Sequence, residues 1–329
     1  MILAMTLAQV VGAIPITRVG RRFPPTTFLR LLVVFRTLAL ASIAVLAHHG
    51  AAFGWLVAFS ALAGAVNGAA FGYLRTVLNA LAPAAKLPRA LGISATLNEV
   101  TFVLAPVAAS GLGGVSPVFA VLVVAALGAI PALLVPTTAA AAVEDAHHPD
   151  ASVVSPAILL WLMCAAAGGS TVAAIEIGAV ALALHFGYAP TLAILFTVPL
   201  CLASVAGGVW VSIRNRMQTR RAVLIQLTIM TVGSILVALQ ISLAVTVLGA
   251  VLVGMVLAPL GTYYSLALDA LAPPKKRPEV FALLRTANAT GVIVASAVMT
   301  AVSLSTALIV VSCLMITVVA VVGLSSRKA

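Results

Sequence analysis

The chain has 329 residues, of which 63% are hydrophobic and 8% are charged, and its mean hydropathy is +1.23. Soluble domains are only about half apolar, so this composition excludes an ordinary soluble domain and indicates a polytopic membrane protein. The formal net charge of +11 does not indicate a nucleic-acid-binding protein, because the basic residues lie in short connections between apolar segments.

A membrane-spanning helix needs about 20 mainly apolar residues to cross roughly 30 Å of hydrocarbon. Eleven such segments follow one another along the chain, at approximately 1–17, 30–47, 53–78, 90–112, 117–136, 156–184, 190–212, 222–241, 245–268, 280–302 and 305–324. We therefore expect an all-α polytopic membrane protein with eleven visible spans.

All eighteen Lys and Arg residues lie at or near alternate connections between these spans. They follow the first span (Arg18, Arg21, Arg22, Arg30, Arg36), the third (Arg75, Lys86, Arg89), the seventh (Arg214, Arg216, Arg220, Arg221) and the ninth (Lys275, Lys276, Arg277, Arg285), and they end the chain (Arg327, Lys328). Because short basic loops stay on the cytoplasmic side, this sorting predicts a multi-pass protein of the plasma membrane with a cytoplasmic C-terminus.

The longest connection, 137–155, carries acidic residues and histidines instead of Lys or Arg. Its Ala, Pro and acidic composition is typical of a flexible tether, so we expect a cytoplasmic linker between an N-terminal bundle, 1–136, and a C-terminal bundle, 156–329. The pair His147 and His148 has no second cluster to join it, and the three cysteines lie inside apolar segments without CxxC spacing. Neither a metal nor a cofactor is therefore predicted.

The chain contains an internal repeat with an offset of 190 residues. The segment LNALAP at 78–83 recurs as LDALAP at 268–273, and nine of the 21 columns from Leu78 to Asn98 are identical. Chance would give about three identities in so Ala- and Leu-rich a sequence. Each copy is a span, a short basic loop and another span, and both copies enter the membrane from the same side. The halves are thus predicted to be parallel repeats, as in one large class of transporters.

The connection after the first span reads AIPITRVGRR at 13–22. Together with the order of spans, this segment resembles the major facilitator superfamily, whose loop between helices two and three has the form Gly-x-x-x-Asp-Arg-x-Gly-Arg-Arg/Lys. The resemblance implies a two-bundle fold of six plus six helices and a candidate gating loop formed by Arg18, Gly20, Arg21 and Arg22. Ala13 and Thr17 replace the family's Gly and Asp, and the Asp is the residue that contacts the second half when the cytoplasmic side is closed.

By this resemblance, the first visible span corresponds to the family's second helix, so the two bundles have five and six visible spans. We expect an upstream start that restores the missing span, as in a mis-started gene model. A truncated, inactive remnant of a transporter is the alternative.

Only two carboxylates lie well within the predicted spans: Glu99, near the middle of its segment, and Glu176, in the outer half of its segment. Ionisable groups within a membrane are costly and are functional candidates by default. A carboxylate shielded from water can take up and release a proton as its access to water alternates, which proton-coupled transport requires. The alternatives are a hydrogen bond to a neighbouring helix and the recognition of a cationic substrate.

Three amides and one arginine are further substrate or proton candidates. Asn98 and Asn288 occupy matching repeat positions, and an amide in hydrocarbon needs a partner across a helix interface, so we expect helix contact first and substrate contact second. Asn67 lies in a small-residue face that permits close helix approach, with a role in a cavity as the alternative. Arg36 sits about two turns into its span, where it can reach back toward the basic loop or contact a substrate anion.

Together these features predict a secondary active transporter that moves a small organic solute by alternating access. A Gly- and Pro-rich antiporter signature on the family's fifth helix is partly echoed by Ala105-Pro106, in place of Gly-Pro, and by the run 110–114, which slightly favours export over import. With the two membrane carboxylates, we expect a proton-coupled exporter. No nucleotide-binding P-loop is present, and the spans hold no polar constellation of the kind that a membrane-embedded enzyme needs. We expect a monomer whose partners are the solute, protons and the bilayer.

Overall fold

The computed structural model describes residues 2–136 and 155–326. Throughout these ranges the regular secondary structure is helical, without strands. This confirms the all-α class. The predicted linker at 137–155 lies outside the described residues except for Ser155.

Eleven α-helices and three short 3₁₀ helices follow one another in the described chain. They are α1 (Ile2–Gly20), α2 (Pro25–His48), α3 (Phe53–Leu81), η1 (Ala84–Lys86), α4 (Leu87–Val115), α5 (Pro117–Leu134), α6 (Pro156–His185), η2 (Pro190–Ala193), α7 (Ile194–Arg214), α8 (Arg220–Leu239), α9 (Leu243–Leu271), η3 (Pro274–Lys276), α10 (Arg277–Ala301) and α11 (Leu304–Ser326). Each α-helix coincides with one predicted span to within a few residues at either end.

Nine of the described helical segments are long and apolar enough to cross a membrane. The α1 helix contributes a shorter apolar stretch, Ala4–Gly20, and α4, which carries Glu99 and several small polar residues, is not one of the nine. Helices suit this setting because all their backbone hydrogen bonds close within the segment. The multi-pass character is confirmed, although two of the eleven predicted spans fall on helices that do not reach this measure.

The described residues pack into two compact units, and each unit takes segments from both halves of the sequence. Unit 1 comprises Met1–Leu81, Leu104–Ser155 and Leu271–Thr286, and unit 2 comprises Ala82–Val103, Pro156–Ala270 and Ala287–Ala329. The start of α4 therefore belongs to unit 2, and the start of α10 belongs to unit 1. The predicted bundles, 1–136 and 156–329, stay a prediction.

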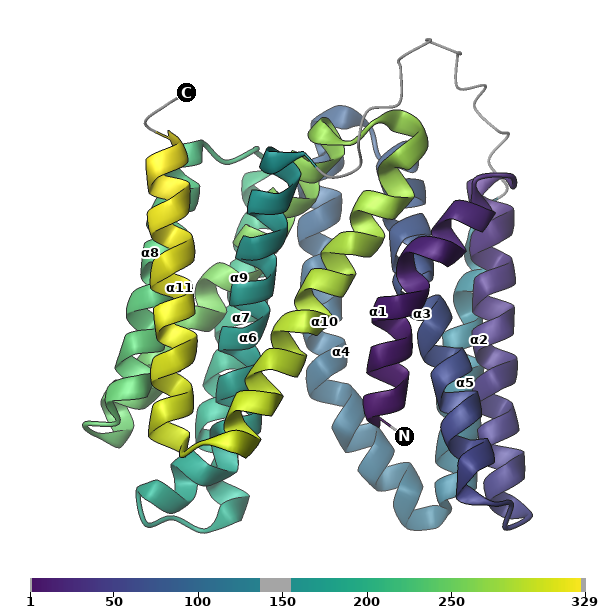
Figure 1. Cartoon of the computed structure of the whole chain (residues 1–329), viewed down its shortest axis with the longest axis horizontal. Coiled ribbons are helices and arrows are strands. Elements are labelled where there is room, and N and C mark those ends of the chain that lie inside the picture. Colours follow the sequence, from purple (N-terminus) through teal and green to yellow (C-terminus); the bar gives the residue numbers. More distant parts are fainter. Residues whose placement is uncertain (1, 137–154, 327–329) are drawn as a thin grey trace. The chain divides into compact units, whose positions relative to one another are not determined.

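In unit 1, α3 packs against both α1 and α2, and α2 packs against α5 (Figure 1). The α1 and α3 backbones approach closely because small residues line their interface. A Cβ atom added at Gly12 would lie 2.6 Å from the carbonyl oxygen of Ala65, and one at Gly68 would lie 3.0 Å from the Cβ of Ala13. The predicted small-residue face on α3 is thus a helix-packing face.

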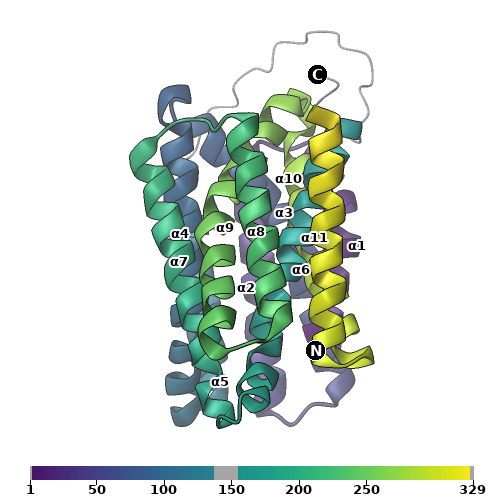
Figure 2. The same ribbon diagram turned by 90° about the vertical axis from the view of Figure 1, so that its left-hand side faces the viewer.

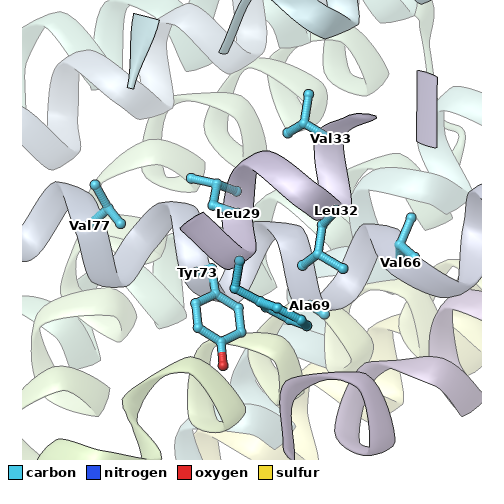
Figure 3. Packing of buried hydrophobic residues seen from close by; sticks show 8 residues of the cluster. Leu29, Leu32, Val33, Val66, Ala69, Tyr73 and Val77 are labelled. Atoms are coloured by element: carbon cyan, nitrogen blue, oxygen red, sulfur yellow. The ribbon is translucent and has the colours of Figure 1, made fainter. Parts of the chain in front are cut away.

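A buried cluster forms the core between α2 and α3. Figure 3 shows its side chains interdigitating; its members are Phe28, Leu29, Leu32, Val33, Val66, Ala69, Tyr73 and Val77. The rings of Phe28 and Tyr73 meet edge to face with centroids 4.9 Å apart, a preferred geometry for aromatic pairs. This cluster holds the start of α2 against α3, and Ile16 near the end of α1 packs against it.

In unit 2, α11 packs against α6 and α8 (Figure 2). The hydroxyls of Ser234 on α8 and Ser312 on α11 share a buried hydrogen bond of 2.7 Å. Gly233 on α8 and Gly249 on α9 face each other so closely that a Cβ on either would lie within 2.7 Å of the other's carbonyl oxygen. Small residues and interhelical hydrogen bonds, the two usual means of helix association in lipid, both operate here.

Within each unit, the basic helix ends gather at one end. In unit 1, Arg30 at the start of α2 donates a hydrogen bond to the carbonyl oxygen of Val135 after α5. In unit 2, Arg220 at the start of α8 donates to the hydroxyl of Ser325 near the end of α11, and Asn215 after α7 bonds to residues at the start of α4. This arrangement agrees with the sorting of Lys and Arg to alternate connections. The assignment of that end, and of the C-terminus, to the cytoplasm stays a prediction.

Candidate functional site

An ion pair joins the end of α1 to the start of α10 within unit 1. Glu279, in the first turn of α10, pairs with Arg21, and its Oε2 lies 3.9 Å from the Nε of Arg18. The Glu279 side chain is only 2% exposed, whereas those of Arg18 and Arg21 are 65% and 38% exposed. The buried carboxylate is stabilised by both cations and by the positive end of the α10 dipole. We call Arg18, Arg21 and Glu279 the α1–α10 contact.

Close packing holds the end of α1 in place for this contact. The hydroxyl of Thr17, which takes the place of the family's Asp, donates to carbonyl oxygens one turn earlier in its own helix. The hydroxyl of Tyr73 on α3 donates to the carbonyl oxygen of Thr17 at 3.1 Å. Gly20 has no room for a side chain, because a Cβ there would overlap the ring of Phe28 and the hydroxyl of Tyr73. The acid that pairs with the α1 arginines therefore comes from α10.

A second contact, in unit 2, joins the end of α7 to the start of α4. The Asn215 side chain accepts a hydrogen bond from the backbone N–H of Arg89 at 3.0 Å and donates one to the carbonyl oxygen of Ala85 at 2.9 Å. Asn215 ends α7 in the left-handed conformation, with φ of 43°, which asparagine tolerates better than most residues. Arg89 and Glu279 are separated by the repeat offset of 190 residues, so both contacts use the same position of the repeat.

The two membrane carboxylates, Glu99 and Glu176, come together in unit 2. Glu99 on α4 interacts with the side chains of Ser204 on α7 and of the adjacent Asn98. Glu176 on α6 is close enough to Glu99 for their negative charges to repel each other. The Ser204 hydroxyl is fully buried and makes no hydrogen bond in the described chain. We call Glu99 and Glu176 the carboxylate pair.

The carboxylate pair is not covered by the rest of unit 2. Glu176 is exposed and Glu99 is partly exposed, although both lie within helices of membrane-spanning length. A bare carboxylate is very unfavourable in hydrocarbon, so this pair requires water, a proton or a cation beside it. Because the two negative charges repel each other, the ionisation of one carboxylate makes the ionisation of the other less favourable.

Two of the predicted amides lie at helix interfaces. The Nδ2 of Asn67 on α3 donates to the Oε1 of Gln9 on α1 at 2.7 Å. Asn288 on α10 packs against α6, where a Cβ added at Gly169 would lie 3.1 Å from the Asn288 carbonyl oxygen and 3.3 Å from its Oδ1. Asn98 is exposed beside Glu99. A direct role of these amides with solute or proton stays a prediction.

Two arginines lie over one phenylalanine ring in unit 1, and a third arginine lies near one of them. The guanidinium carbons of Arg75 on α3 and Arg285 on α10 lie 5.4 Å and 5.8 Å from the centroid of the Phe71 ring. Arg36 on α2 is close enough to Arg285 for their positive charges to repel. Arg75 and Arg285, which the charge pattern groups with the connections, thus lie within helices. We call Arg36, Arg75 and Arg285 the arginine cluster.

The surroundings of the arginine cluster do not balance its charge. An ion removed from water loses several kcal/mol of effective solvation. A cation–π contact with an aromatic ring returns only about 0.5–2 kcal/mol. Within the part of the chain that the structure describes, no carboxylate pairs with any of these three guanidinium groups. The cluster is therefore a candidate for an external anion.

Reasoning from the sequence missed Glu279 and Gln9. Glu279 stands beside a basic connection, and its repeat counterpart Arg89 is also charged, so the repeat alignment held a signal for it. The sequence held no signal for Gln9, because its partner Asn67 is 58 residues away on another helix.

Comparison with known proteins identifies the family. The family model of the Major Facilitator Superfamily matches residues 1–296. No curated protein matches the chain.

Solved structures of transporters share the fold. The human organic anion transporter MFSD10 (TETRAN) is 14% identical, with a TM-score of 0.76, and the match covers 97% of this chain and 82% of that one. A bacterial homologue of the iron transporter ferroportin, in an outward-facing state, is 13% identical, with a TM-score of 0.79 and coverage of 99% and 88%. The E. coli fucose:proton symporter FucP is 13% identical, with a TM-score of 0.72 and coverage of 98% and 90%. With the family model matching most of its length, the chain belongs to the Major Facilitator Superfamily and has the fold of a membrane transporter, not that of an enzyme.

Proposed function

We propose that this protein is a secondary active transporter that exports a small organic solute in exchange for protons, by alternating access. The single observation that carries the proton coupling is the carboxylate pair, in which Glu99 on α4 and Glu176 on α6 are close enough for their negative charges to interact. The proton is bound when the pair is shielded from water and released when water reaches it.

The α1–α10 contact supports alternating access. A closed gate needs interactions strong enough to hold one state and weak enough to break in each cycle. Glu279 is buried, but its arginine partners are partly exposed, so opening returns the arginines to water they already touch. Only the carboxylate has to be rehydrated. We assign this contact to the cytoplasmic side, where basic loops are retained.

Proteoliposomes that contain the protein and a pH-sensitive dye test the proposal. The membrane potential is clamped with potassium and valinomycin, and phenylphosphate, choline or fucose is added outside in turn. An exchanger that takes one of these solutes inward must move protons outward, so the lumen should become more alkaline. Protein-free liposomes report passive leak.

Variants of the pair give the decisive comparison. Glu99→Gln and Glu176→Gln keep the size of the side chain but remove the titrating group, so each should abolish solute-driven proton movement. Glu99→Asp keeps a carboxylate and should retain part of the solute-driven proton movement. Unchanged proton flux in both glutamine variants would remove proton coupling from the proposal, and a lumen that becomes acidic would make the protein a symporter.

A further inference from the structure

We infer that the arginine cluster binds the anionic group, a carboxylate or a phosphate, of the solute, an assignment that rests on the proposed transport function. The transported solute is then a small organic anion. The cluster lies in unit 1 and includes no member of the carboxylate pair, so anion binding and proton binding are separate properties of the chain.

The cluster is built from three helices, two of which bring an arginine to the same ring. Phe71 and Arg75 are four residues apart on α3, which places them on the same helix face, and Arg285 reaches the same ring from α10. Phe71 therefore orients two guanidinium groups toward a common place. Arg36 adds a third positive charge from α2.

Two buried donors in the cluster have no acceptor. The Nη1 of Arg75 and the Nε of Arg36 are shielded from solvent and make no hydrogen bond in the described chain. Buried polar groups are nearly always hydrogen-bonded, and a guanidinium offers five N–H donors in a fixed planar fork. Each of the three arginines is partly exposed. An external carboxylate or phosphate can serve as the acceptor, because it pairs with a guanidinium through two parallel hydrogen bonds.

The position of the cluster argues against arginines that simply reach back to the membrane surface. Arg75 is six residues before the end of α3, and Arg285 is eight residues after the start of α10. At 1.5 Å per residue these positions are about 9 Å and 12 Å inside the helix ends. A side chain that only reached back to the surface would have exposed nitrogen atoms, but the Nη1 of Arg75 is buried.

Calorimetric titration of the full chain in nanodiscs of zwitterionic lipid tests the assignment. The probes are phenylphosphate and benzoate, and choline serves as the cationic comparator. Wild type should bind at least one of the two anions and not choline. Arg75→Gln and Arg285→Gln should each weaken anion binding at least tenfold, because each removes a charge-assisted hydrogen-bond donor. Arg75→Lys should recover only part of the affinity, since an ammonium group lacks the planar fork.

Arg221→Gln is the matched control, because it removes the same charge from an exposed position at the start of α8. It should leave anion affinity unchanged. Far-ultraviolet circular dichroism and gel filtration confirm that each variant is folded. Phe71→Leu is a second test, because it keeps all three charges but removes the ring that orients the Arg75 and Arg285 guanidinium groups. It should weaken anion binding less than either glutamine variant.

Absence of anion binding in wild type overturns the assignment, as does binding that the arginine variants leave unchanged. A phospholipid headgroup offers the same phosphate chemistry, so a parallel set of nanodiscs contains phosphatidylglycerol. Retention of that lipid only when Arg75 and Arg285 are present, without binding of either soluble anion, would make the site a lipid site and refute the assignment to the solute.

The two proposals fail in different experiments. Arginine-dependent anion binding without any proton movement would contradict proton-coupled exchange but leave the anion site intact. Proton movement driven by choline or fucose, without anion binding, would support proton-coupled exchange and refute the anion site.

Discussion

The two sides of the α1–α10 contact differ in exposure, so substitutions on the two sides should differ in their effect on stability. Arg21→Gln leaves the buried Glu279 carboxylate with only Arg18, at 3.9 Å, as a partner. Removal of one partner from a buried pair destabilises by about 3–5 kcal/mol. Arg18 remains and Arg21 is itself 38% exposed, so we expect a loss below this range, about 2–3 kcal/mol.

The converse substitution, Glu279→Gln, should be milder. It leaves no buried charge, and both arginines can turn to water, so the loss should be about 1 kcal/mol, that of one hydrogen bond. The double variant should be no less stable than Arg21→Gln alone, which gives a coupling energy of about 1–2 kcal/mol. Arg22→Gln removes the same charge from an exposed neighbour and should change stability by less than about 0.5 kcal/mol.

Equilibrium unfolding in mixed detergent micelles, with all four variants measured at one detergent composition, provides the free energies of unfolding. Equal losses for Arg21→Gln and Glu279→Gln would refute the reasoning from exposure. A double variant whose loss is the sum of the two single losses would show that the two residues are not energetically coupled.

Three further substitutions test the packing that supports this contact. Gly20→Ala should destabilise by about 1–3 kcal/mol because its Cβ overlaps the Phe28 ring and the Tyr73 hydroxyl, whereas Gly111→Ala, with open space around it, should be neutral in the same thermal melts. Tyr73→Phe should lose about 1 kcal/mol with its hydrogen bond, and an unchanged melting temperature would contradict that bond. Asn67→Leu should lose about 0.6–2 kcal/mol with its contact to Gln9; a second substitution at Gln9 should then add little, and full additivity would exclude the contact.

Much of the fold could be predicted because the membrane constrains it. A segment that crosses hydrocarbon must satisfy its own backbone hydrogen bonds, so hydropathy marks its ends. The span predicted at 53–78 is Phe53–Leu81, and that at 156–184 is Pro156–His185. The glycine stripe on α3 also predicted close helix packing, because small residues serve that purpose in lipid.

The partners of functional residues could not be predicted in the same way. Counting charges along the chain groups Arg75 and Arg285 with the loops, and only tertiary packing brings them to Phe71. Thr17 stands where the family has an Asp that contacts the second half of the chain. The structure supplies the acid from Glu279, 262 residues along the chain from Thr17 (279 − 17). This exchange keeps the charges balanced in space, and only the repeat alignment with Arg89 held a signal for it in the sequence.

The central claim is that the α1–α10 contact opens and closes during transport. Spin labels at Arg22→Cys and Pro274→Cys, in a background in which Cys164, Cys201 and Cys313 are replaced by serine, report the distance across it in liposomes. We predict two distance populations, with Glu279→Gln increasing the longer one several-fold. A single distance distribution that Glu279→Gln leaves unchanged would contradict alternating access at this contact.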